Sequence, residues 1–235
     1  MRILYVFPHP DDESYGPGLA IARQRRENHE VHLLTLTKGG ATKQRHKFGY
    51  TVEQMGEVRY KEMRNVAREL DLSSMTVLDL PDSELKELCP EEIERHIKDH
   101  IERLDPDIVI TYALHGISGY DDHLVMHAAV KSVFCDLRRD GASRPRRLAF
   151  FCIREDAQHD DAAHGLRPSR EQDIDCAYEI ADEDFATARR ALACYETYKD
   201  KIGEEDPLGR MGRTIYFEIF GEDHTPPLAD LTNDL

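Results

Sequence analysis

Short apolar runs typical of strands alternate with longer amphipathic segments along most of this chain, and this alternation limits the fold more than any other feature of the sequence. In the segment 51–72, for example, apolar residues recur at the three- and four-residue spacing of a helix face. Alternation of this kind is typical of a mostly parallel sheet with helices on both faces. The sequence therefore predicts a three-layer α/β fold.

The pattern predicts strands at 2–7, 30–37, 75–80, 107–112, 146–153, 173–180 and 213–220. It predicts helices at 14–28, 51–72, 90–104, 122–139 and 182–202. We expect one α/β domain over 1–220 with an elaborated C-terminal part, followed by a flexible acidic tail at 221–235. In such sheets ligands bind beyond the carboxyl ends of the strands, so loops that run from strand to helix form the candidate active edge.

Composition excludes several classes of function. The net charge of −15 argues against a nucleic-acid binder, which needs Lys and Arg to neutralise phosphates. No apolar run approaches the roughly 20 residues that span a bilayer, so we expect no membrane partner. Five scattered cysteines without a CxxC pair favour reduced thiols and a cytoplasmic location. The sequence is compatible with a homo-oligomer and does not specify one.

Two polar clusters follow predicted strands on the active edge. PHPDDE at 8–13 comes directly after the first strand, and LHGISGYDDH at 114–123 follows the strand at 107–112. If these strands are neighbours, His9, Asp12 and His123 can supply two nitrogens and a carboxylate to one metal ion, which is a catalytic zinc arrangement. A cation would also offset the repulsion among the adjacent carboxylates.

Purely structural roles for these polar residues remain open as well. Asp and Ser after each strand can simply cap the following helix. His127 lies four residues beyond His123 on the same helix face, and we expect it to pack rather than to bind metal. The polar stretch 154–173 either overhangs the active edge as a lid or is a plain surface insertion.

With these motifs in place, the chain resembles the LmbE-like, PIG-L-like zinc-dependent N-acetylglucosaminyl deacetylases. PHPDDE matches the family's first motif, GYDDH is a degenerate form of its later H-P-D-H, and the helix with Arg59 and Glu62 also looks like the family's. The resemblance covers about the first 140 residues and, more weakly, the long helix predicted at 182–202. It implies a Rossmann-like fold and a Zn²⁺ cofactor, although iron or manganese also accepts such ligands.

The resemblance implies a role for each matched residue. His9, Asp12 and His123 correspond to the metal ligands, and Asp11 to the general base. Asp122 corresponds to the acid that orients a neighbouring group. Further matches are Arg59, an arginine that holds substrate or product, and Glu13, a structural acid that fixes the loop.

The second motif departs from the family at one position. Tyr120 stands where the family has the first histidine, which is thought to steady the oxyanion or assist proton transfer. Three alternatives follow: Tyr120 acts as a neutral hydrogen-bond donor, His115 takes over the role, or Asp11 carries both proton transfers.

The substrate implied by the resemblance is an N-acetylglucosamine (GlcNAc) conjugate. The loop 37–47 leaves a strand on the active edge, and its Lys38 and Arg45 are candidates for a clamp on an anionic group, with a solvated basic loop as the alternative. An anionic handle favours GlcNAc-malate, the substrate of the bacillithiol pathway.

Two other functions remain open: a zinc amidase acting on another N-acyl metabolite, and a non-catalytic sugar- or nucleotide-binding α/β module. The absence of GxGxxG after the first strand argues against the nucleotide-binding case.

Overall fold

The computed structural model describes residues 1–155 and 165–235, and it confirms the predicted three-layer α/β fold. Seven strands form one sheet in the order β3-β2-β1-β4-β5-β7-β6. Their bounds are β1 (Arg2–Phe7), β2 (Glu30–Thr37), β3 (Ser74–Leu80), β4 (Ile108–Tyr112), β5 (Arg147–Cys152), β6 (Cys176–Glu179) and β7 (Thr214–Ile219). The first five strands are parallel, and β7 runs antiparallel between β5 and β6.

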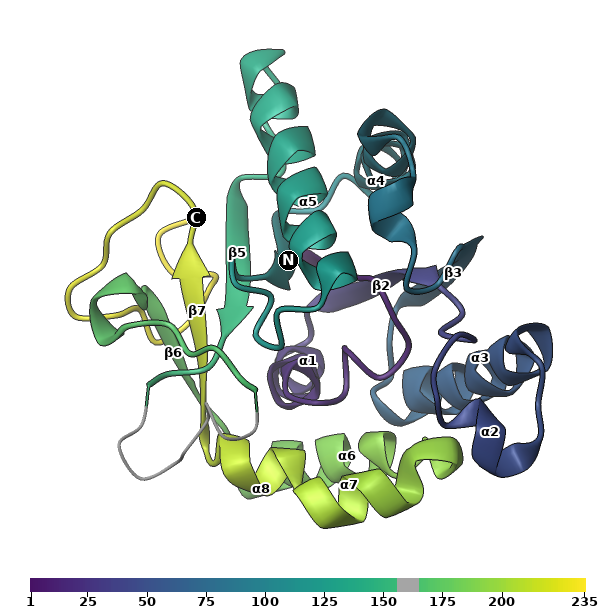
Figure 1. The fold of residues 1–235 in the computed structure, drawn as a ribbon. Helices are drawn as coiled ribbons and strands as arrows, with labels where there is room; N and C mark the ends of the chain where they lie inside the picture. The colour runs from purple at the N-terminus through teal and green to yellow at the C-terminus, as the bar shows by residue number, and fades with distance from the viewer. Residues whose placement is uncertain (156–164) are drawn as a thin grey trace.

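The helices cover both faces of this sheet, as Figure 1 shows. They are α1 (Pro17–Arg26), α2 (Arg45–Phe48), α3 (Val52–Glu69), α4 (Pro90–Leu104), α5 (Asp121–Arg139), α6 (Asp182–Leu192), α7 (Lys199–Glu205) and α8 (Pro207–Met211). One apolar core packs α1, α3 and α6 against the sheet, and a second packs α4 and α5 against the opposite face. The central strands are buried on both faces, which explains why β1 and β4 are apolar almost throughout.

Local sequence signals explain several helix boundaries. Thr51 and Gln54 form a capping box, in which each side chain accepts a hydrogen bond from the other's backbone N–H, so α3 starts at Val52. α4 starts at Pro90 and carries Glu91 and Glu92 in its first turn, where acids interact favourably with the helix dipole.

The sequence prediction of one long helix at 182–202 is wrong. α6 ends at Leu192, a 3₁₀ turn follows at Glu196–Tyr198, and α7 begins at Lys199. The backbone N–H of Thr197 donates to Glu62 Oε1 at 2.8 Å instead of to a helical carbonyl. A tertiary contact therefore replaces the helical hydrogen bond and turns the chain toward α3.

The segment 221–235, for which the sequence predicts a flexible tail, has fixed contacts in the structure. Leu228 N donates to Asp175 O at 2.8 Å and its carbonyl accepts from Ala177 N at 2.9 Å, so the segment pairs with β6. Arg147 donates to the carbonyls of Leu231 and Asn233. These bonds are strong local constraints that acidic composition alone does not reveal.

Replacing Leu231 tests whether this packing stabilises the domain. Because its side chain is fully buried, Leu231→Ala is expected to lower the free energy of unfolding by about 2–5 kcal/mol. Urea unfolding followed by circular dichroism measures the change, with Leu114→Ala, a leucine that is 72% exposed, as the matched control. Equal stability of the two variants would mean that the C-terminal segment frays in solution.

Within residues 1–155 and 165–235, no helix combines the length and apolar content that a bilayer-spanning segment needs.

Candidate metal centre

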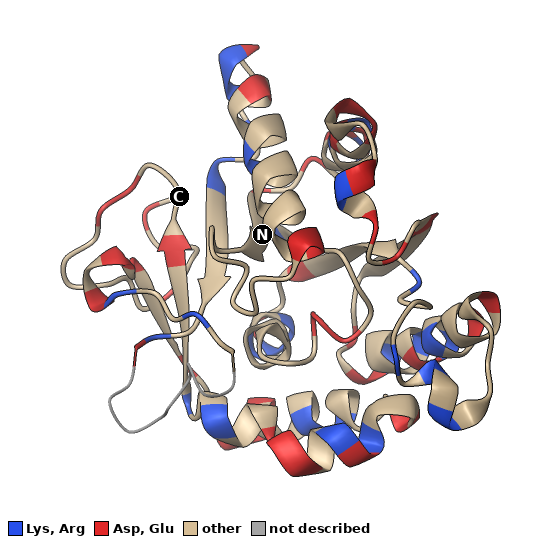
Figure 2. Ribbon diagram, viewed as in Figure 1, with Lys and Arg blue, Asp and Glu red and all other residues tan. Residues whose placement is uncertain are grey.

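The two polar clusters meet because β1 and β4 are adjacent. They pair in parallel, with Tyr5 opposite Ile110, while β2 and β3 extend the sheet on one side and β5 on the other. The loops that leave the carboxyl ends of β1 and β4 therefore flank the point where the strand order reverses, the preferred ligand site of such sheets. In Figure 2 the acidic residues of the loop after β1 and of the first turn of α5 lie close together.

His9, Asp12 and His123 come together as the sequence predicts. His9 Nδ1 lies 3.4 Å from Asp12 Oδ2, and His123 Nε2 lies 3.4 Å from Asp12 Oδ1. One ligand atom from each residue lies within 4.8 Å of the other two. Two ligands about 2.05 Å from one tetrahedral zinc ion are about 3.3 Å apart, close to the distance from each imidazole nitrogen to its nearer Asp12 oxygen, although the two nitrogens face different oxygens of that carboxylate.

The orientation of His123 is fixed by the loop after β4. Its Nδ1 donates to the carbonyl of Gly116 at 2.9 Å, and its ring stacks on Tyr112 with centroids 4.3 Å apart. This hydrogen bond leaves the Nε2 lone pair facing Asp12, as a metal ligand requires. Gly116 has a φ of +61°, and a Cβ there would lie 2.8 Å from the Cβ of His123, so this turn requires glycine.

His9 is held from its other nitrogen by two carboxylates. Its Nε2 lies 3.0 Å from Asp122 Oδ2 and 3.4 Å from Asp82 Oδ1. One ligand atom from each of His9, Asp82 and Asp122 also lies within 4.8 Å of the other two. We assign Asp122 as the hydrogen-bond partner of His9 Nε2 and Asp82 as a nearby negative charge, because a ligating imidazole commonly donates its second N–H to a carboxylate and because two histidines with one acid suit zinc better.

Asp122 contacts His9, and the orienting role that the resemblance implies for it stays a prediction. Its carboxylate also accepts from the backbone N–H groups of Ser83, at 2.9 Å, and Leu85, at 3.2 Å. Burial alone would lower the pKa of His9, but its hydrogen bonds to Asp12 and Asp122 outweigh burial and raise that pKa to about 10. The cluster is thus rich in negative charge, which a bound cation would offset.

Asp12 is the shared partner of both imidazoles. Tyr112 donates its hydroxyl proton to Asp12 Oδ1 at 2.8 Å, and the backbone N–H of His9 donates to Oδ2 at the same distance. Burial acts to raise the pKa of Asp12, but His123 and His9 together hold it below its usual range. An ionised carboxylate is the form that a metal ion binds.

Asp11 lies beside this cluster and contacts Arg59. Arg59 Nη2 donates to Asp11 Oδ2 and to the carbonyl of Pro10, both at 2.6 Å, and Nη1 donates to Gly39 O at 3.0 Å. Burial raises the pKa of Asp11 to about 6, against the opposing charge of Arg59. A carboxylate with a raised pKa that is not itself a ligand suits a general base. Arg59 is only 3% exposed, and its contacts hold the loop; a contact with substrate stays a prediction.

The basic loop has other contacts in the structure. Lys38 Nζ pairs with Glu57 at 2.7 Å and with Asp79 at 3.4 Å. Arg45 Nη1 donates to the carbonyls of Ala41 and Thr42. Among the described residues, neither cation contacts the three ligand side chains, and the predicted anion clamp stays untested.

His115 and Tyr120 differ clearly in their surroundings. His115 Nδ1 accepts the backbone N–H of Ile117 at 3.1 Å, and Nε2 lies 2.9 Å from Ser169 Oγ. Both ring nitrogens are therefore occupied away from the ligands. Tyr120 is 66% exposed and stands edge-on to His123, with ring centroids 5.8 Å apart. Of the alternatives left by the sequence, Tyr120 and Asp11 remain.

Two further predictions can be compared with the structure. His127 donates from Nδ1 to Tyr112 O at 2.9 Å and packs on Phe150, which confirms the packing role. The stretch proposed as a lid, 154–173, falls partly outside the described residues, because 156–164 are not described.

Sequence reasoning missed Asp82 and Tyr112. Asp82 follows the strand at Ser74–Leu80, so the active-edge rule could have identified it, whereas Tyr112 is one aromatic residue within a buried strand.

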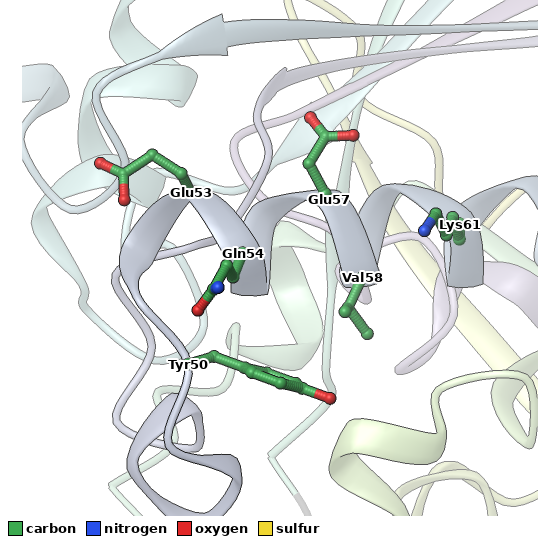
Figure 3. A pocket seen from close by; sticks show the side chains of 6 residues that line it. All are labelled: Tyr50, Glu53, Gln54, Glu57, Val58 and Lys61. Carbon is green, nitrogen blue, oxygen red and sulfur yellow. The ribbon is translucent and has the colours of Figure 1, made fainter.

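A surface hollow of about 390 Å³ lies on the outer side of α3 (Figure 3). It is lined by Tyr50, Glu53, Gln54, Glu57, Val58 and Lys61. None of these residues is one of the three candidate metal ligands, so we assign the hollow no part in the proposed reaction.

Comparison with known proteins identifies the family. A sequence model described as PIG-L: GlcNAc-PI de-N-acetylase matches residues 4–134, more than half of the chain. The chain belongs to the PIG-L family. The matched segment of this PIG-L chain contains His9, Asp11, Asp12 and His123, and ends before the segment that joins α6 to α7.

Curated relatives of this PIG-L chain align over part of their length. It is 29% identical over 138 residues to a probable N-acetylglucosaminyl-phosphatidylinositol de-N-acetylase of Schizosaccharomyces pombe, covering 56% of this chain and 51% of the relative. It is 27% identical over 156 residues to a probable N-acetyl-alpha-D-glucosaminyl L-malate deacetylase 2 of Bacillus subtilis, covering 65% of this chain and 68% of that relative. The chain thus spans about half to two thirds of the length of these relatives.

Solved structures share the fold. A triple mutant of a deacetylase of the teicoplanin biosynthetic pathway superposes with a TM-score of 0.71 at 17% identity, over 93% of this chain and 97% of that one. The N,N'-diacetylchitobiose deacetylase of Pyrococcus horikoshii superposes with a TM-score of 0.66 at 18% identity, over 93% of this chain and 83% of that one. At such identities the likeness shows the fold alone.

Proposed function

We propose that this PIG-L protein is a metal-dependent hydrolase that removes the acetyl group from an N-acetylglucosamine conjugate. The observation that carries the proposal is the convergence of His9, Asp12 and His123 within 4.8 Å, with Asp11 next to them. Family membership and the names of the curated relatives supply the substrate class.

Zinc fits the ligand set best. Each imidazole is oriented by a hydrogen bond from its second nitrogen, and one ligand atom from each of the three residues lies within 4.8 Å of the other two. A zinc ion held by these residues would act as a Lewis acid that acidifies a water and polarises the acetamide carbonyl.

The protein side chains then move the protons. Asp11 takes a proton from the attacking water, whose oxygen adds to the carbonyl carbon of the acetamide. Asp11, now protonated, gives that proton to the sugar nitrogen as the carbon–nitrogen bond breaks. The products are acetate and a free amino sugar. The Tyr120 hydroxyl donates a hydrogen bond to the negative charge that develops on the carbonyl oxygen.

Tyr120→Phe tests the last of these roles. Removal of the hydroxyl is expected to lower kcat by about 10- to 100-fold with little change in KM, because the bond forms chiefly in the transition state. Steady-state kinetics measure the change, and Tyr50→Phe, another exposed tyrosine, is the control. An unaltered kcat would show that Tyr120 does not stabilise the oxyanion and would favour the alternative in which Asp11 carries both proton transfers.

GlcNAc-malate, the substrate of the bacillithiol pathway, is the conjugate we propose. The probable N-acetyl-alpha-D-glucosaminyl L-malate deacetylase 2 of Bacillus subtilis aligns over 68% of its length. The 1D-myo-inositol 2-acetamido-2-deoxy-alpha-D-glucopyranoside deacetylase of Kineococcus radiotolerans aligns over 46% of its length. Lys38, on the loop after β2, and Arg45, the first residue of α2, are the proposed contacts for the malate carboxylates. Arg59 is proposed to help hold substrate or product, chiefly through its contact with Asp11.

Acetate release on GlcNAc-malate, GlcNAc-inositol and N,N'-diacetylchitobiose, with and without a chelator, tests the proposal. We expect the highest kcat/KM on GlcNAc-malate, loss of activity with the chelator and recovery on adding Zn²⁺. Acetate release from another conjugate would correct the substrate. If the protein releases no acetate from any of the three, it is an amidase for another N-acyl metabolite or a binding module, and its metal content as purified separates the two. Stoichiometric bound metal favours the amidase.

A further inference from the structure

A buried tyrosine from the C-terminal part of the chain contacts the loop that carries Asp11. Tyr195 lies in the segment between α6 and α7 and is fully buried. The backbone N–H of Asp11 lies 2.8 Å from its hydroxyl oxygen, and Glu13 Oε1 lies 2.7 Å from the same atom. This tyrosine is outside the family match at 4–134, and no sequence motif indicates it.

The directions of these two hydrogen bonds are fixed by chemistry. A backbone N–H can only donate, so the Tyr195 oxygen accepts from Asp11. The single hydroxyl proton is then directed to Glu13 Oε1, which also accepts from Ser14 Oγ at 2.6 Å. Tyr195 thus joins two points of the PHPDDE loop through one atom, and Glu13 fixes the loop as the sequence predicts.

The Asp11 backbone needs such support. Its φ is +81°, in the left-handed region that residues other than glycine seldom adopt. The Asp11 carbonyl accepts from Ser14 N at 2.8 Å and Tyr15 N at 3.0 Å, which closes the turn on one side. The Tyr195 hydroxyl satisfies the N–H on the other side, so both polar groups of this peptide backbone are held.

The segment around Tyr195 is itself anchored to α3. Thr197 donates to both carboxylate oxygens of Glu62 at 2.8 Å. The Tyr198 ring packs against the Arg59 guanidinium, 4.7 Å from the ring centroid, and Arg59 holds the Asp11 carboxylate. The backbone and the side chain of Asp11 are therefore positioned by one connected set of contacts.

We propose that Tyr195 is a positioning residue that holds the Asp11 loop in the geometry needed for proton transfer. This inference rests on the proposed function for its kinetic consequence, but the loop contact can be tested without any substrate. Among the described residues, the Tyr195 hydroxyl bonds to Asp11 and Glu13 and to none of the three ligand side chains, so it acts through the loop.

Tyr195→Phe is the test, because it removes the hydroxyl and keeps the ring. We expect kcat to fall by about 10- to 100-fold while KM and the metal content stay within about twofold, since small misplacements of a catalytic group cost rates of this order. Deuterium exchange measured by mass spectrometry should become faster in peptides that contain residue 11. The matched control is Tyr178→Phe, a fully buried tyrosine on β6 that makes no hydrogen bond to the PHPDDE loop among the described residues.

The outcomes separate clearly. A kcat within twofold of the unmodified protein, or a loss of kcat that only follows a loss of metal, overturns the proposal. If the unmodified protein releases no acetate, the proposed function fails and deuterium exchange alone decides: faster exchange at residue 11 supports the positioning role, and unchanged exchange overturns it. If Tyr195→Phe does not fold, exchange in the unmodified protein decides in the same way, with a protected Asp11 amide as the supporting result and an exposed-amide rate as the contrary one.

Discussion

His123→Ala is expected to lose bound metal and, with it, about a thousand-fold or more of kcat/KM. His123 Nε2 faces Asp12 at 3.4 Å, and its other nitrogen is already bonded to the Gly116 carbonyl, so Nε2 is the nitrogen that would bind the ion. Without this ligand two donors remain, His9 and Asp12, which is too few for tight binding. The attacking water would then keep a pKa near 15.7 instead of about 7.

Metal analysis of the purified variant and acetate release on the best substrate measure these effects. His96→Ala, a histidine on α4 remote in sequence from both motifs, is the matched control and should keep one metal ion per chain. A His123→Ala protein that retains a full complement of metal and near-normal turnover would show that the ion binds elsewhere, and the His9, Asp82 and Asp122 group would become the alternative.

The ligand set could be predicted because its members stand at fixed places in a simple pattern. His9 and Asp12 follow one buried strand directly, and His123 opens the helix after another. In a parallel sheet the loops after strands share one edge, which places both clusters at the same end. The adjacency of β1 and β4, however, depends on the order of the strands in the sheet, which cannot be read from the pattern of strands and helices along the chain.

The residues that sequence reasoning missed act through tertiary contacts. Asp82 and Tyr112 hold the ligands His9 and Asp12, and Tyr195 holds the Asp11 loop, but each is a single residue outside any motif. Helical periodicity at 182–202 even predicted the wrong local structure around Tyr195, because periodicity does not register a buried contact with another segment.

Charge in the sequence was also a weak guide to contacts. Lys38 and Arg45 form a basic loop, but Lys38 pairs with Glu57 and Asp79, and Arg45 donates to its own loop. In a chain with 46 acidic residues and 31 basic ones, a local cluster of cations finds acidic neighbours readily. A substrate carboxylate would have to compete with these partners for Lys38 and Arg45. The acetate-release assay on the three conjugates therefore tests the proposed anion clamp better than the sequence does.

Asp11→Asn is expected to keep the metal and lose about 10²- to 10⁴-fold of kcat, the usual contribution of a general base. Asn tolerates the left-handed backbone at φ +81°, and its amide oxygen can still accept from Arg59. Because Asp11 is not among the three clustered ligand residues, metal content should stay equal to that of the unmodified protein. An amide oxygen does not accept a proton from water, so the rate of the chemical step should fall while metal binding is unchanged.

Stability must be measured with the kinetics, because Arg59 is buried and loses its ionised partner in this variant. Urea unfolding shows whether the protein is folded under assay conditions, and single-turnover acetate release then reports the chemical step. Asp71→Asn, an exposed carboxylate paired with Arg25 outside both motifs, is the matched control and should keep full activity. If a folded, metal-loaded Asp11→Asn protein turns over within tenfold of the unmodified one, another group accepts the proton from water, and the role given to Asp11 is wrong.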